Sequence, residues 1–185
     1  MGGNVIFYSS DKGQAMMRGT GEMILIFNEN LPDLGSDQLR SATRYVERKG
    51  IALYDELAEY APAGEGATVS SPCAVNGYCV YNSRLVFNIS GGRLMMIDGI
   101  RAFDGEIELQ EEETIDAVSA IMYFLDAVRN EGIICREICG IEAGYFMNVA
   151  VLGECTLRPV WKVITDTGDI YINALSGKHE LLTMG

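Results

Sequence analysis

Residues 85–97 have the sequence Leu-Val-Phe-Asn-Ile-Ser-Gly-Gly-Arg-Leu-Met-Met-Ile, in which two apolar runs surround a short glycine turn. Two β-rich runs joined in this way predict a β-hairpin. The same arrangement, with an aromatic residue after a branched one, recurs at residues 5–17 and 159–172. Recurrence along a chain predicts repeated structural units. The hairpin is therefore the element from which the expected fold is built.

Two helix candidates lie between the three hairpins. They cover residues 36–49 and 111–129, and both end in similar segments that contain a glycine, at residues 46–51 and 128–133. Apolar residues of the second candidate recur at spacings of three and four: Ile115, Val118, Met122, Leu125 and Val128. This spacing predicts that the stripe packs on a core, and that the second helix buries more than the first.

Helices separated by several antiparallel strands predict an α+β fold. We expect two repeated units, each laying one helix over a curved antiparallel sheet, at residues 21–104 and 105–185. Residues 1–20 would then be the last hairpin of a preceding unit. Within the first repeat, we expect a central strand at residues 22–27, a further helix at 52–60 and a flexible loop at 61–67.

The charge of the chain excludes two classes of ligand. Its 26 acidic and 14 basic residues give a net charge of −12, so nucleic acid and anionic membrane surfaces would be repelled. No apolar run approaches the roughly 20 residues that a membrane span requires. If residues 1–20 are half of a unit, the natural chain begins further upstream, where we expect a membrane anchor.

The residue types that support catalysis are sparse. The single histidine, His179, lies in a polar tail, and neither a nucleophile elbow nor a phosphate-binding loop occurs. Glu111–Glu113 are explained by the positive end of the helix that they begin. The five cysteines lack zinc-site spacing, although Cys73 and Cys79 flank a turn and could pair. We therefore expect no catalytic residue, no metal and no cofactor.

Three aromatic residues are candidates for a contact surface. Trp161 and Tyr171 are expected on facing strands of the last hairpin, and Tyr145 near the start of the preceding strand. Core or cross-strand packing is one interpretation. The other is a sheet face that docks a protein partner, because Trp and Tyr are favoured anchors at interfaces.

Residues 113–178 resemble the YycH/YycI family of membrane-tethered regulators in Gram-positive bacteria. The similarity begins with a helix of the Ala117–Ala120 type and a segment at 138–145. It continues with Leu-Arg-Pro-Val-Trp-Lys-Val at 157–163 and Ile-Tyr-Ile-Asn-Ala at 170–174, followed by Ser-Gly. The resemblance implies an extracytoplasmic α+β module behind one N-terminal membrane helix. It also implies that the protein restrains a WalK-type sensor histidine kinase. It implies no catalytic residue.

Three functional hypotheses follow. The first is a non-enzymatic regulator at the extracytoplasmic face of the membrane, in contact with a sensor kinase or a sister regulator. The second is a PepSY-like inhibitory or peptide-binding module that captures an extended peptide at an unfilled edge strand or groove. The third is an enzyme that uses acidic residues, for which a pocket with several carboxylates is required. A homodimer and a cytoplasmic location stay open as alternatives.

Overall fold

The computed structural model describes residues 5–28, 32–101, 113–149 and 155–180. The chain divides into two compact units. Unit 1 comprises residues 1–105 and 147–156, and unit 2 comprises residues 106–146 and 157–185. Each unit combines a helix with β-strands, which confirms the expected α+β class. The expected strand start at residue 106 and the side chains of Glu111 and Glu112 lie outside the described residues.

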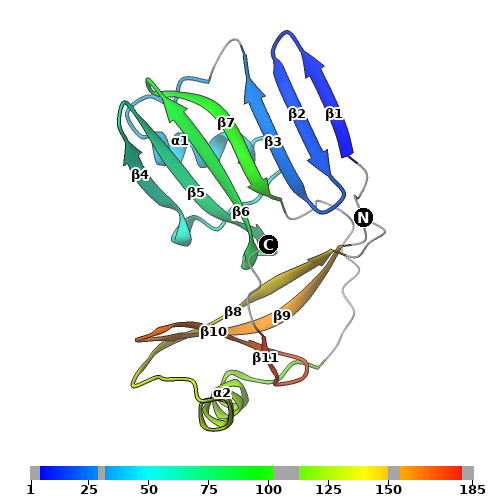
Figure 1. Cartoon of the computed structure of the whole chain (residues 1–185), viewed down its shortest axis with the longest axis vertical. Coiled ribbons are helices and arrows are strands. Elements are labelled where there is room, and N and C mark those ends of the chain that lie inside the picture. The colour runs from blue at the N-terminus through cyan, green and yellow to red at the C-terminus, as the bar shows by residue number, and fades with distance from the viewer. Residues whose placement is uncertain (1–4, 29–31, 102–112, 150–154, 181–185) are drawn as a thin grey trace. The chain divides into compact units, whose positions relative to one another are not determined.

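The sheet of unit 1 is antiparallel throughout. Its strands lie in the order β1-β2-β3-β7-β6-β5-β4, so β1 and β4 are its two edges (Figure 1). The strands are β1 (Val5–Ser10), β2 (Gly13–Arg18), β3 (Glu22–Phe27), β4 (Glu59–Ala63), β5 (Gly66–Val75), β6 (Tyr78–Ser90) and β7 (Arg93–Ile100). The first two hairpins and the central strand at 22–27 are therefore confirmed.

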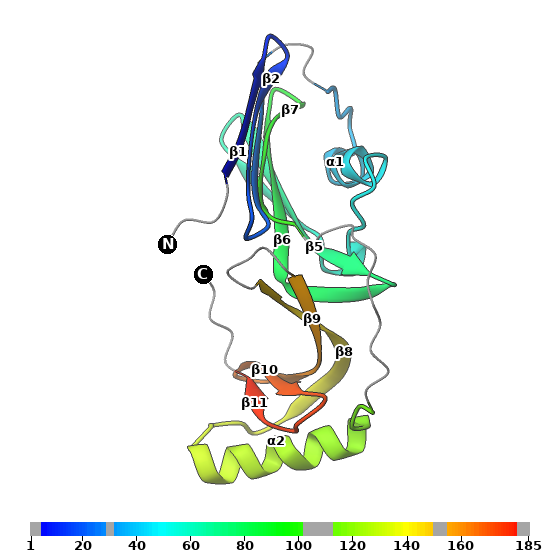
Figure 2. The same ribbon diagram turned by 90° about the vertical axis from the view of Figure 1, so that its right-hand side faces the viewer.

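Helix α1 (Gln38–Glu47) covers one face of this sheet (Figure 2). The helix begins at Asp37, whose carboxylate accepts a hydrogen bond from the backbone N–H of Arg40 at 3.1 Å. It buries Ala42, Thr43 and Val46. The core of unit 1 lies between α1 and the central strands, and its completely buried side chains include Val69, Leu85, Phe87 and Ile97.

The first hairpin, formed by β1 and β2, is joined to the sheet of unit 1. β2 pairs with β3 over five residue pairs, from Gly13–Phe27 to Met17–Met23, so β1 and β2 extend the sheet of unit 1. Among the described residues, unit 1 has seven complete strands, more than unit 2 has. The structure therefore does not establish the expected repetition of two equivalent units.

Residues 52–67 also differ from the prediction. Instead of a helix and a loop, they contain a short 3₁₀ helix (Asp55–Leu57), strand β4 and the start of β5. The glycine- and proline-rich segment that predicts a loop contains a two-residue turn at 64–65. Pro62 is tolerated in β4 because an edge strand has backbone N–H groups that need no partner in the sheet.

Unit 2 contains α2 (Ala117–Glu131), β10 (Gly168–Asn173), β11 (His179–Glu180) and most of β8 (Ile138–Val149) and β9 (Cys155–Thr165). The end of β8 and the start of β9, from residue 147 to residue 156, belong to unit 1. The β9–β10 pair is the third predicted hairpin. Helix α2 packs on β10 and β11 (Figure 2). The core cluster of unit 2 contains four buried residues: Ala120, Phe124, Val163 and Ile172.

The apolar stripe predicted for this helix is divided. Ile115 and Val128 pack against the core cluster, whereas the three residues between them face away from it. Val118, Met122 and Leu125 are 71%, 59% and 38% exposed. The buried row is Ala120, Phe124 and Ala127. Both rows have helical spacing, and the predicted row is the one with the larger side chains. The small side chains of Ala120 and Ala127 let the helix approach the sheet closely around one large side chain, Phe124.

The described cysteines are free thiols. Cys73 pairs across the strands with Val80, and Cys79 with Ala74. Directly paired residues share a face of the sheet and consecutive residues alternate, so Cys73 and Cys79 point to opposite faces. A disulfide between these two cysteines is incompatible with this register.

Candidate functional site

The three aromatic residues singled out in the sequence do not form one surface. Trp161 pairs with Ile172, whereas Tyr171 pairs with Lys162, so the two aromatic side chains lie on opposite faces of the β9–β10 hairpin. Tyr171 is buried and its ring packs against that of Phe146, with 4.7 Å between centroids. Tyr145 is half-buried on the neighbouring strand.

Trp161 has an internal role on the helix side of the hairpin. Its indole Nε1 donates a hydrogen bond of 2.9 Å to the backbone carbonyl of Ile115, just before α2 begins. Its ring packs against the core cluster of unit 2. These contacts explain Trp161 and Tyr171 as packing residues, and contact of the three residues with a partner stays a prediction.

Exposed apolar residues gather instead on β1. Its first four residues, Val5, Ile6, Phe7 and Tyr8, are 54%, 68%, 65% and 66% exposed. Among the described strands, β1 pairs only with β2, through six consecutive residue pairs without a bulge. Soluble proteins usually protect such an edge with charge, proline or a bulge, because it is a template for pairing with another chain.

The pairing pattern shows which backbone groups of β1 are free. The N–H of Asn28 donates to the carbonyl of Lys12, so this carbonyl points toward β3. Because this direction alternates along an antiparallel strand, Gly13 directs its hydrogen bonds toward Ser10 of β1. By the same alternation, the backbone N–H and C=O groups of Val5, Phe7 and Ser9 point away from β2, to the open edge.

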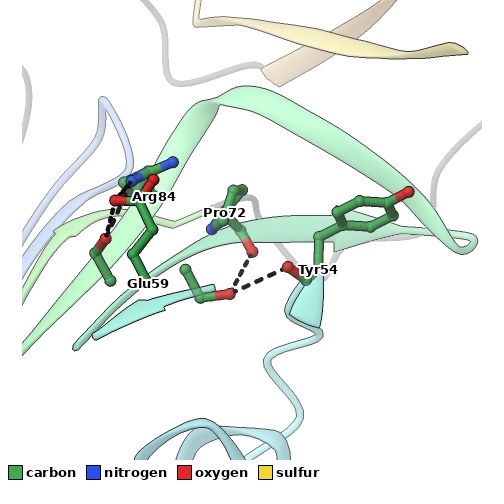
Figure 3. A network of polar contacts seen from close by, with 6 residues as sticks. Tyr54, Glu59, Pro72 and Arg84 are labelled. Atoms are coloured by element: carbon green, nitrogen blue, oxygen red, sulfur yellow. Dashed lines mark hydrogen bonds and ion pairs between the residues drawn. The ribbon is translucent and has the colours of Figure 1, made fainter. Parts of the chain in front are cut away.

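The opposite edge of the same sheet is protected. β4 contains Pro62, and the carboxylate of Glu59 forms an ion pair of 3.2 Å with Arg84. The guanidinium of Arg84 also donates to the hydroxyl of Ser70 at 3.0 Å (Figure 3). Figure 3 also shows the neighbouring network, in which a serine hydroxyl bonds the carbonyls of Tyr54 and Pro72. The two edges of unit 1 are thus chemically different.

A groove adjoins β1 on the helix side of the sheet. One row of paired residues crosses the sheet from the core to the open edge: Val69, Phe87, Ile97, Leu25, Ala15 and Tyr8. The first three are completely buried, and Tyr8 is 66% exposed. Helix α1 therefore covers one end of this row and leaves the other end open, which creates the groove.

The groove has a volume of about 310 Å³ and its walls are mainly apolar. Its wall from α1 includes Tyr45, whose ring packs edge-on against Phe27 with 5.8 Å between centroids. Burial raises the pKa of the Tyr45 hydroxyl, so this group stays neutral. Among the described residues of the lining, the charged ones are Lys12 and Lys49, and none is a carboxylate.

This lining bears on the chemistry that the groove can support. Acid–base catalysis by paired carboxylates would need acidic residues, and the part of the lining that the structure describes contains none. Within the described ranges, no three His, Cys, Asp or Glu side chains lie close enough to hold a metal ion. What the groove and β1 offer is apolar surface, two cations and unpaired backbone groups.

The sequence contained a signal for this site. Residues 5–8 are four consecutive apolar residues without the lysine or proline that commonly guards an edge strand. Their exposure depends on β1 being the outermost strand.

None of the helices within the described ranges has the length and apolar character needed to cross a bilayer.

No family model matches the chain, and no curated protein matches it. Among solved structures, the C-terminal domain of YpeB from Bacillus megaterium is similar, with a TM-score of 0.48 and 12% sequence identity. The similarity covers 96% of this chain and 86% of that structure. It is a distant likeness, from which no function follows. Because no family model matches, the resemblance of residues 113–178 to the YycH/YycI family stays a prediction.

Proposed function

We propose that this protein is a non-enzymatic contact module that adds an extended segment of another protein to strand β1. The supporting observation is the difference between the two edges of unit 1. Proline and an ion-paired glutamate guard β4, whereas β1 presents four exposed apolar residues on a regular ladder. Backbone hydrogen bonds would supply affinity, and side-chain contacts would supply specificity.

The free backbone groups of Phe7 allow a selective test. Phe7→Pro removes an N–H that points to the open edge and leaves the ladder with β2 intact, since edge strands tolerate proline there. Phe7→Thr is the matched control, because it removes the ring and keeps the N–H. Twelve-residue peptides selected by phage display on the unaltered protein would serve as ligands for both variants.

We expect Phe7→Pro to weaken peptide binding by about tenfold, which corresponds to the loss of one backbone hydrogen bond. Phe7→Thr should weaken it much less. Bound peptide should also slow hydrogen exchange at the Phe7 and Ser9 amides. Equal affinity of the two variants for every selected peptide, or the absence of any selected peptide, would rule out strand addition at β1.

The identity of the partner is a further part of the proposal. The resemblance of residues 157–174 to the YycH/YycI family supports a sensor histidine kinase or a sister regulator, contacted outside the cell membrane. The extracytoplasmic segment of a sensor kinase from the same genome is the direct probe. Co-purification with the unaltered protein but not with the Phe7→Pro variant is expected, and co-purification with both would place the contact elsewhere.

A further inference from the structure

The two charged residues of the groove have the opposite sign to the chain as a whole. The chain has a net charge of −12 and contains only four lysines. Two of the four, Lys12 and Lys49, line the groove, and the lining residues within the described ranges include no acidic side chain. A cationic groove in a strongly acidic protein indicates selection for an anionic group.

Both lysines are available for a ligand. Among the described residues, neither ammonium group forms an ion pair, although other cations such as Arg18 and Lys162 do. Lys12 lies in the turn between β1 and β2, and Lys49 follows the end of α1. The two cations therefore approach the groove from the sheet and from the helix, and the apolar residues lie between them.

The pairing of a segment added to β1 fixes which of its side chains enter the groove. Directly paired residues share a face, so residues opposite Tyr8 and Ser10 point to the face of the sheet where the groove lies. These positions are two apart in the added segment. The one opposite Ser10 is nearer to the turn that contains Lys12, and the one opposite Tyr8 adjoins apolar walls.

We propose that Lys12 and Lys49 select an added segment that carries an apolar residue and an acidic residue two positions apart. The apolar side chain occupies the groove beside Tyr8, and the carboxylate binds the two ammonium groups. This inference rests on the proposed strand addition, and it specifies the chemical class of the segment.

The anion preference can be measured without any peptide. Anilinonaphthalene sulfonate is an aromatic anion, in which the sulfonate stands in for the carboxylate, and phenylnaphthylamine is its neutral analogue. Both become fluorescent on apolar surfaces. The Lys12→Gln/Lys49→Gln variant tests the two cations, Lys178→Gln is the control for removing a lysine elsewhere, and Ala15→Trp fills the groove.

We expect the double lysine variant to bind the anionic probe about tenfold more weakly, because it loses two partly exposed ion pairs with the sulfonate. Its affinity for the neutral probe should not change, and Lys178→Gln should affect neither. Ala15→Trp should weaken both probes. An equal effect of the double variant on the two probes, or an anionic signal that survives Ala15→Trp, would overturn the inference.

Peptides separate this inference from the proposed function. In peptides whose binding requires the Phe7 N–H, replacing the acidic residue by its amide should weaken binding to the unaltered protein and not to the double lysine variant. If strand addition holds but the amide peptide binds equally well, only the lysine inference is wrong. If oleate displaces the anionic probe and the acidic peptide does not, the groove takes a free fatty acid and the assignment to a peptide is wrong.

Discussion

The side chain of Asn82 pairs with the backbone of Met147 as another strand residue would. Its Nδ2 donates to the carbonyl of Met147 at 2.7 Å, and its Oδ1 accepts from the N–H of Met147 at 2.7 Å. Asn82 lies where the β5–β6 register shifts, between the pairs Pro72–Arg84 and Cys73–Val80. An amide side chain thus replaces a ladder pair at an irregularity of unit 1.

Replacing Asn82 by alanine should destabilise the fold, because both backbone groups of the buried Met147 would lose their partner. We expect a loss of about 1–3 kcal/mol in the free energy of unfolding, measured by urea titration. Asn82→Asp should also be destabilising, since a carboxylate cannot donate to the carbonyl. Asn148→Ala, at an exposed neighbour, is the control. A value for Asn82→Ala no larger than that of the control would contradict this prediction.

Truncations on α2 should distinguish its two apolar rows. Phe124 is 1% exposed and Met122 is 59% exposed. Phe124→Ala leaves a cavity in the core of unit 2 and should cost about 3–5 kcal/mol. Met122→Ala should cost less than about 1 kcal/mol. Thermal unfolding of the two variants side by side gives the comparison, and the reverse order would mean that the predicted stripe is the packed one after all.

Substitution of Gly177 should be more harmful than that of another glycine with similar backbone geometry. A Cβ at Gly177 would lie 2.6 Å from the ring of Tyr123, and φ is +69°. Gly132 has φ of +72° but open space around it. Gly132→Ala should therefore cost only the backbone strain, about 1 kcal/mol, and Gly177→Ala distinctly more. Urea titration of both variants tests this, and shortening Tyr123 to alanine should remove the excess cost.

Asp166 should contribute to the way the free energy of unfolding changes as the pH falls. The backbone N–H of Arg136, which donates to its carboxylate at 3.0 Å, is the main cause that lowers the pKa of Asp166. A carboxyl group with a lowered pKa in the folded state stabilises the fold above its unfolded pKa of about 3.9, and loses this contribution as the pH falls further. Asp166→Asn should therefore be less stable than the unaltered protein at pH 7. The deficit should shrink toward pH 2 in urea titrations, and a constant deficit would contradict the linkage.

Asp98 should show the opposite sign. Burial raises the pKa of Asp98, partly offset by a hydrogen bond from Asn88. A raised pKa means that ionisation costs the folded state stability as the pH rises above the unfolded value. Asp98→Asn should therefore be more stable than the unaltered protein at pH 7 and equal to it at pH 3. Lower stability of the variant at pH 7 would show that the charge is favourable there.

Local chemistry explains which parts of the fold were predictable. The hairpins at Gly13, Gly92 and Gly168 can be predicted from the sequence because a turn and its two flanking runs are adjacent in the chain. The existence of α1 and α2 followed from helical spacing. The packed face of α2 did not, because two apolar rows were present and only contact with Val163 and Ile172 decides between them.

The candidate site depends on pairing between distant parts of the chain. β3 pairs with β7, some seventy residues later, and this pairing makes β1 the outer strand. Nothing within residues 5–10 specifies that outcome. Residue type alone favours a shared surface for Trp161 and Tyr171, but the register of β9 and β10 places them on opposite faces.

The asymmetry between Pro62 and Phe7 also limits how large an assembly through this sheet can become. Filaments elongate only when every newly added copy offers a fresh end for the next. Here, a copy joined through β1 would present β4 on its far side, and that strand terminates growth. Edge-to-edge association through unit 1 therefore closes at a pair, which lets an apolar strand remain open in solution without seeding fibres.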